Sequence, residues 1–106
     1  MGAFTVPVHI PFHRTVLHTK KGAWLCRVAS LLAGDQDAIG FQLCLEHADS
    51  ENKRRLFLMV SAADLESPQE QAIIAQRICV WIEDGEGNGA LDLVPAWRRK
   101  RLQKIA

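Results

Sequence analysis

The chain has 106 residues, of which 48% are hydrophobic and 24% are charged, and its formal net charge is +1. This length suits a single domain over residues 1–106 that buries about two thirds of the surface its unfolded chain exposes, without disulfides or a metal. The balanced composition excludes a disordered chain, and no apolar run reaches the roughly 20 residues of a membrane-spanning helix. We therefore expect one soluble domain.

The first residues and the cysteines indicate the compartment. The start, MGAFTVPVHIPFH, has no basic stretch followed by a continuous apolar run, so it does not read as a signal peptide. Cys26, Cys44 and Cys79 are odd in number and form no C-x-x-C pair, which favours reduced thiols that pack as small apolar residues. We expect a cytoplasmic protein with no cofactor, no metal and no membrane contact.

Residues 6–13 alternate between apolar side chains and prolines or histidines, which predicts a strand. Pro7 and Pro11 have the same parity, so only one side of the strand loses its N–H donors, and we expect an edge strand. His9 and His13 would then lie about 13 Å apart, too far to share one metal ion. His18 has the other parity, so the sequence predicts no histidine metal site.

Three further strands are expected over residues 23–32, 41–47 and 54–61, because polar turns at residues 19–22, 33–37 and 48–53 separate runs rich in β-forming residues. Burial of the leucines sets the register of the last two strands. The predicted pairs are Leu45 with Leu56, Leu43 with Leu58, Phe41 with Val60, Cys44 with Phe57, Gln42 with Met59, and Glu46 with Arg55. Strand 54–61 is apolar on both faces, so both faces need cover.

A helix is predicted from Pro68 to Asp84. Ser67 is a capping hydroxyl, Pro68 takes the first helical position, and Glu70 stands three residues after the cap. The alternative is a short helix that breaks near Gln76, followed by a strand over residues 78–83 that pairs with residues 90–94, because this run is rich in β-branched side chains. One helix covers one face of the sheet, so the second apolar face needs cover from sheet closure, the N-terminal strand, the C-terminal segment or another subunit. A symmetric homodimer is the economical hypothesis. The candidate interface residues are Phe57, Met59 and Trp81.

The segment after the helix resembles the first part of an EF-hand calcium loop. Oxygen-bearing side chains stand at Asp84, Glu86 and Asn88, and Gly89 follows them. Pro95 occupies the place of the bidentate glutamate, and the chain holds no second copy of the loop. A solvent-exposed connection explains the three glycines equally well, so calcium is a secondary hypothesis.

The C-terminal segment 96–105 is basic and has apolar residues at helical spacing, which predicts a short amphipathic helix. Its cations would contact phosphates and its tryptophan would stack on a base if the partner were a nucleic acid. The candidate nucleic-acid-binding residues are Trp97, Arg98, Arg99, Lys100, Arg101 and Lys104.

No enzyme signature is present, and pairs such as Cys26 with His47 or Asp64 with Glu66 are combinations that any small protein offers. We predict an α+β domain in which an antiparallel meander of four or five strands packs against the main helix and the short basic C-terminal helix. The predicted function is a non-catalytic interaction module that self-associates. The alternatives are a nucleic-acid-binding protein and a small enzyme or ligand-binding domain with an unrecognised pocket.

Overall fold

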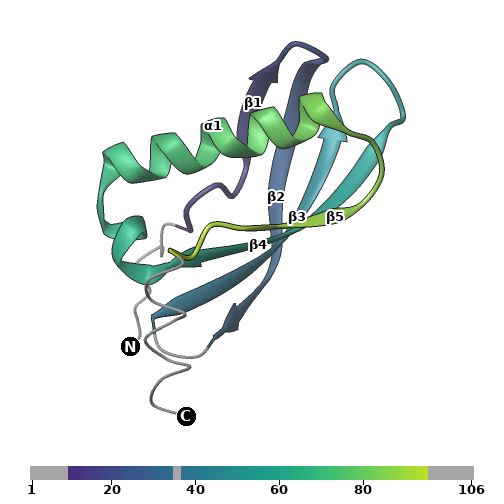
Figure 1. Cartoon of the computed structure of the whole chain (residues 1–106). Helices are drawn as coiled ribbons and strands as arrows, with labels where there is room; N and C mark the ends of the chain where they lie inside the picture. The colour runs from purple at the N-terminus through teal and green to yellow at the C-terminus, as the bar shows by residue number, and fades with distance from the viewer. Residues whose placement is uncertain (1–9, 35–36, 96–106) are drawn as a thin grey trace, which may run out of the picture.

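The computed structural model of the chain describes residues 10–34 and 37–95. The elements in chain order are β1 (Thr15–Thr19), β2 (Gly22–Ala33), β3 (Ala38–His47), β4 (Lys53–Ser61), the 3-10 helix η1 (Ala62–Glu66), α1 (Pro68–Asp84) and β5 (Gly89–Asp92). The described strands form one sheet in the order β1-β2-β3-β4-β5, against which α1 packs (Figure 1). The α+β prediction is confirmed. None of the helices in this part of the chain is long and apolar enough to cross a membrane.

Helix α1 has the predicted bounds. The Ser67 hydroxyl accepts a hydrogen bond from the Glu70 backbone N–H at 3.3 Å, which satisfies one of the free donors of the first turn. Ile74, Ile78 and Ile82 are buried at four-residue spacing and form the face that meets the sheet. The alternative strand over residues 78–83 is therefore wrong.

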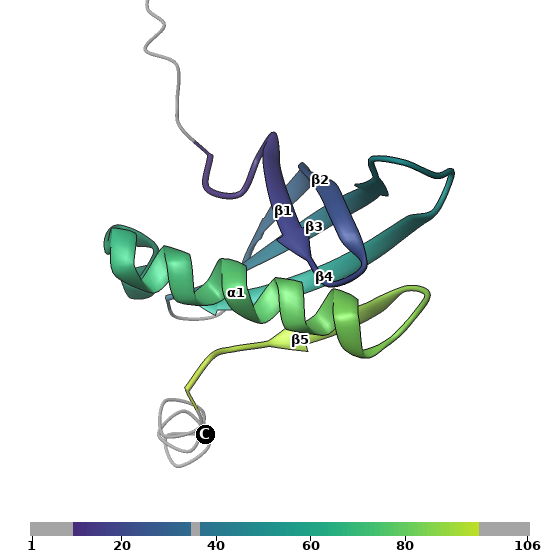
Figure 2. The ribbon, with the colours of Figure 1, turned by 90° about the horizontal axis from the view of Figure 1, so that it is seen from above.

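The last strand corrects the predicted topology. Strands β1 to β4 form an antiparallel meander, but β5 pairs parallel with β4. The reason is that η1 and α1 carry the chain back along one face of the sheet, so β5 starts at the same end as β4. Seen from above, α1 lies along one side of the strands and β5 follows it at the sheet edge (Figure 2). The antiparallel prediction fails at this one pair.

The predicted edge strand over residues 6–13 is also wrong in the part that the structure describes. Residues 11–14 form a turn with positive φ at Phe12 (69°) and Arg14 (58°), and the edge strand is β1 instead. The break in the pleat turns Phe12 into the core, where its ring meets Phe41 edge to face at 5.6 Å. Residues 6–9 lie outside the described part.

The register of β3 and β4 differs from the prediction by two residues. The structure pairs Leu43 with Leu56, Phe41 with Leu58, Ile39 with Val60, Leu45 with Arg54, Cys44 with Arg55, Gln42 with Phe57, Gly40 with Met59, and Glu46 with Lys53. The shift closes the hairpin nearer its loop, where the His47 N–H donates to the Asn52 carbonyl at 3.0 Å. Because side chains alternate with period two, a two-residue shift leaves the predicted face of each residue unchanged.

The core lies between α1 and one face of the sheet. Its buried sheet residues are Leu17, Trp24, Cys26, Phe41, Leu43, Leu45, Leu56, Leu58 and Val60. We call the opposite surface of the sheet the open face. No described element covers the open face, as the prediction of one helix on one face requires. The predicted basic C-terminal helix lies outside the described residues.

Candidate functional site

The open face has an apolar half. The register places Leu32, Gly40 and Met59 in one row across three strands, with Phe57 in the next row. A Cβ built on Gly40 would lie 2.8 Å from the Phe57 ring and 3.4 Å from the Met59 sulfur, so the ring lies over the glycine. We call Leu32, Gly40, Phe57 and Met59 the apolar strip. Two of its members, Phe57 and Met59, are predicted interface residues.

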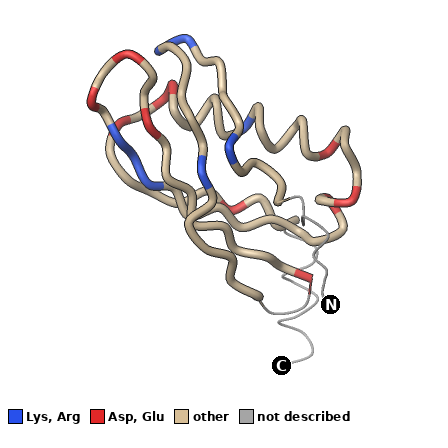
Figure 3. Tube along the Cα trace, turned by 180° about the vertical axis from the view of Figure 1, so that it is seen from behind, with Lys and Arg blue, Asp and Glu red and all other residues tan. Residues whose placement is uncertain are grey.

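The other half of the open face, towards the β3–β4 hairpin, is charged. Arg27 donates to the Glu46 carboxylate at 3.5 Å, and Lys53 and Arg55 are exposed beside this pair. Blue and red segments accordingly lie on the hairpin half of the strands in the view from behind (Figure 3). The Ser30 hydroxyl donates to the Gln42 side-chain oxygen at 2.6 Å at the border between the halves. The apolar strip is therefore a confined patch.

Among the described residues, strand β2 has an edge without a strand partner beside this strip, and we call it the free edge of β2. β1 pairs only with Gly22–Cys26, and the Val28 N–H donates to the His13 imidazole at 3.0 Å. From residue 29 to residue 33, β2 has a strand partner only on its β3 side within the described chain. Leu31 and Leu32 are 49% and 47% exposed there. This edge contains no proline and no charge, the features that usually protect an edge.

Trp81, the third predicted interface residue, is separated from Phe57 and Met59. It lies on the α1 side of the sheet, where the Arg54 guanidinium stacks 4.0 Å from the ring centroid. A Cβ on Gly89 would lie 3.1 Å from the same ring. The structure brings Phe57 and Met59 together on the open face and uses Trp81 to pack the end of α1 against β5.

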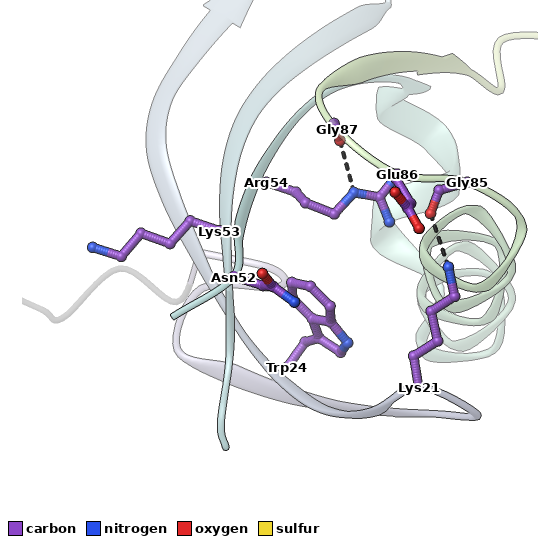
Figure 4. A pocket seen from close by; sticks show the side chains of 8 residues that line it. All are labelled: Lys21, Trp24, Asn52, Lys53, Arg54, Gly85, Glu86 and Gly87. Atoms are coloured by element: carbon purple, nitrogen blue, oxygen red, sulfur yellow. Dashed lines mark hydrogen bonds between the residues drawn. The ribbon is translucent and has the colours of Figure 1, made fainter. Parts of the chain in front are cut away.

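Arg54 fixes the C-terminal end of α1. The residue is 7% exposed, and its Nη1 donates to the Ile82 carbonyl at 2.9 Å. Its Nε donates to the Gly87 carbonyl at 2.7 Å (Figure 4). Burial lowers the pKa of the guanidinium, and the nearby Glu86 carboxylate opposes this shift. The last turn of α1 contains no basic residue of its own. Arg54 therefore supplies the cation that the helix dipole favours at this end.

The calcium candidates are spread along this connection. Asp84 ends α1, Glu86 interacts with Arg54, and the Asn88 side-chain oxygen accepts the Arg55 backbone N–H at 2.8 Å. Among the residues described, no group of three His, Cys, Asp or Glu side chains is placed to hold a metal ion. The Asn88 oxygen is therefore engaged by a protein donor in this arrangement.

The members of the suggested pair Cys26 and His47 both have structural surroundings. His47 packs edge to face on Trp24 at 5.0 Å, and its Nε2 lies 2.8 Å from the Lys21 carbonyl. Cys26, Cys44 and Cys79 are free thiols, and Cys26 is fully buried. Burial, with a smaller effect from Cys44, raises the pKa of the Cys26 thiol to about 12. This shift is the opposite of what a nucleophilic cysteine needs.

The Cys26 shift gives a testable pH dependence. The unfolded thiol ionises near pH 9.0 and the folded thiol near 12, so the folded state is favoured fully below pH 9.0 and loses this advantage as the pH rises. The free energy of unfolding should fall by about 1.4 kcal/mol per pH unit from this group alone. Urea unfolding of the Cys26→Ala variant should lack this part of the alkaline slope. The Cys44→Ala variant should keep most of it, because burial is the larger cause of the shift, and equal slopes in all three proteins would contradict the assignment.

The six nucleic-acid candidates, Trp97, Arg98, Arg99, Lys100, Arg101 and Lys104, lie outside the described residues. Comparison with protein-family models, with curated proteins and with solved structures finds no match. The surfaces described above are therefore the features that bear on function. The sequence does not predict the contacts that Arg54 makes at the end of α1, which we call the Arg54 junction. A signal for it exists: Arg54 has the same strand parity as Leu56 and Leu58, which places an arginine on the buried face.

Proposed function

We propose that the protein is a non-catalytic interaction module that self-associates through the free edge of β2 and the adjoining apolar strip. The observation that carries the proposal is the exposure of Leu31 and Leu32 on a strand edge that lacks a described partner. Backbone groups on such an edge form a ready template for another strand. The strand that pairs with this edge belongs to a second copy of this chain.

Self-pairing suits the chemistry of this edge. The residues from Val28 to Ala33 are uncharged, so two copies lying antiparallel bring no like charges together. The same arrangement joins the two apolar strips across a twofold axis, which makes the contact identical for both copies. A contact of this small extent suits a micromolar, transient dimer.

Light scattering coupled to size exclusion tests the proposal over loading concentrations from about 1 to about 100 µM. We expect a concentration-dependent shift from monomer to dimer, and we expect Leu32→Lys to abolish it, because a lysine on an edge blocks strand addition. Ile73→Lys is the matched control, since Ile73 is also half-exposed but lies on α1. A wild-type chain that stays monomeric throughout, or a Leu32→Lys dimer, would overturn the proposal.

A variant lacking residues 1–9 separates two explanations of a monomer. If that segment covers the β2 edge within its own chain, its removal converts a monomeric protein into a dimer, and the proposal fails for the full chain. If the edge is open in the full chain, both proteins dimerise alike.

A cytoplasmic location belongs to the same proposal. Nucleic-acid binding by Trp97, Arg98, Arg99, Lys100, Arg101 and Lys104 stays a prediction.

A further inference from the structure

A second surface feature lies at the end of the sheet where three connections meet. A pocket of about 310 Å³ opens between the β1–β2 turn, the start of β4 and the loop from α1 to β5 (Figure 4). We call it the end pocket. It is lined by Lys21, Trp24, Asn52, Lys53, Arg54, Gly85, Glu86 and Gly87. Its volume is at the lower limit of small-molecule sites.

The end pocket contains an unsatisfied donor. Trp24 is 4% exposed, and its indole Nε1 is buried without a hydrogen-bond partner in the described structure. An unpaired buried N–H costs about 1 to 3 kcal/mol, so an acceptor at this position would be stabilising. In Figure 4 the Trp24 nitrogen lies on the side of the ring that faces Lys21. The orphan donor therefore lies on the Lys21 side of the ring.

Two cations at the pocket are held in place by carbonyls. Lys21 Nζ donates to the Gly85 carbonyl at 3.1 Å, and Arg54 uses Nε and Nη1 on Gly87 and Ile82. The remaining Arg54 nitrogen, Nη2, borders Gly85, where an added Cβ would lie 3.8 Å from it. Arg54 is buried, so its attraction for an anion is less screened than that of a surface arginine. The donors are thus positioned before any ligand arrives.

Glu86 is the internal competitor for these donors. Its carboxylate acts electrostatically on Arg54 from the exposed loop, and in Figure 4 it lies beside the guanidinium. A ligand anion must displace this carboxylate or share the cations with it. Removing the charge of Glu86 should therefore strengthen binding, whereas removing a donor should weaken it.

We propose that the end pocket binds a small oxyanion, a phosphate or carboxylate group, through Lys21, Arg54 and the Trp24 indole N–H. The site is distinct from the β2 edge and does not depend on self-association. Its recognition chemistry is a charge-assisted set of hydrogen bonds from two cations and one neutral donor.

Nuclear magnetic resonance of the ¹⁵N-labelled full chain tests this proposal, with inorganic phosphate and acetate as probes and chloride at equal ionic strength as reference. We expect phosphate or acetate to shift the Trp24 indole resonance saturably, and the stronger of the two identifies the oxyanion. Lys21→Gln and Trp24→Phe should each weaken binding at least tenfold, because each loses a hydrogen bond to a charged group. Since Trp24→Phe has no indole resonance, its binding is followed on the backbone amides of Gly85 and Gly87, which line the pocket. Glu86→Gln should tighten binding by roughly the factor of three to ten that one removed like charge gives.

Lys20→Gln is the matched control, because it removes the same charge from the neighbouring position of the same turn without lining the pocket. Its binding should match that of the unsubstituted chain. Equal effects of Lys20→Gln and Lys21→Gln would indicate general attraction to a basic surface and overturn the proposal. A Trp24 resonance that responds to chloride as it does to phosphate, or a crystal grown in phosphate with only a water on Nε1, would also overturn it.

Discussion

Replacing Arg54 with methionine is expected to lower the free energy of unfolding by about 3 to 5 kcal/mol. Methionine keeps much of the buried stem but removes the donors to the Ile82 and Gly87 carbonyls and the cation that stacks on Trp81. Both carbonyls would then lack this partner at the end of α1, where the helix dipole is negative. Urea unfolding followed by circular dichroism at neutral pH measures the loss.

Arg55→Met is the matched control for this substitution. Arg55 is the next residue of β4, but it is exposed and its side chain lies on the open face, so the expected change is within about 0.5 kcal/mol. Arg54→Lys should fall between the two, because lysine keeps the charge but lacks the planar fork that reaches two carbonyls. A similar loss for Arg54→Met and Arg55→Met would show that the junction does not hold the helix end.

The main helix could be predicted because its signals are local. Ser67, Pro68 and Glu70 mark its start, and the isoleucines at 74, 78 and 82 lie on one face whatever the sheet does. The face of each side chain on β3 and β4 is also predictable from the sequence, because it depends only on whether the residue number is odd or even along the strand. The register itself failed by two residues, since only hairpin closure at His47 and Asn52 decides between pairings of the same parity.

The missed features depend on residues far apart in the chain. Phe12 and Arg14 have positive φ, which sequence alternation over residues 6–13 does not reveal, and the edge strand consequently begins at Thr15. The parallel pairing of β5 requires knowing the direction in which α1 returns along the sheet. These outcomes follow from tertiary packing, which overrides local strand patterns.

The two candidate surfaces also differ in how far local sequence patterns predict them. The sequence predicts an uncovered face at Phe57 and Met59, because β4 is apolar on both sides. Only its hydrophobic character makes Trp81 a candidate for the same interface. The end pocket needs three connections to meet, and no spacing within the chain places Lys21 beside Gly85. Arg54 offered a signal that was overlooked: a helix without a basic residue in its last turn, together with an arginine on the buried parity of a central strand.

The turn between β1 and β2 gives the second large expected effect. Gly22→Ala should lower the free energy of unfolding by about 2 to 4 kcal/mol, from backbone strain and a steric clash together. Gly22 has φ of 104°, which side chains rarely adopt, and an added Cβ would lie 2.6 Å from His47 Nε2. The clash would displace the imidazole from the Lys21 carbonyl, 2.8 Å away, and from its packing on Trp24. Urea unfolding measures the loss.

Gly87→Ala separates the two contributions. Gly87 also has positive φ, 80°, but an added Cβ would meet no atom within 4 Å, so this variant should lose only the strain, about 1 to 2 kcal/mol. In a double-mutant cycle, Gly22→Ala should cost less in a His47→Ala background than in the unsubstituted chain, because the clashing ring is gone. Equal costs in both backgrounds would mean that backbone strain alone requires glycine here and that His47 does not depend on the open space at Gly22.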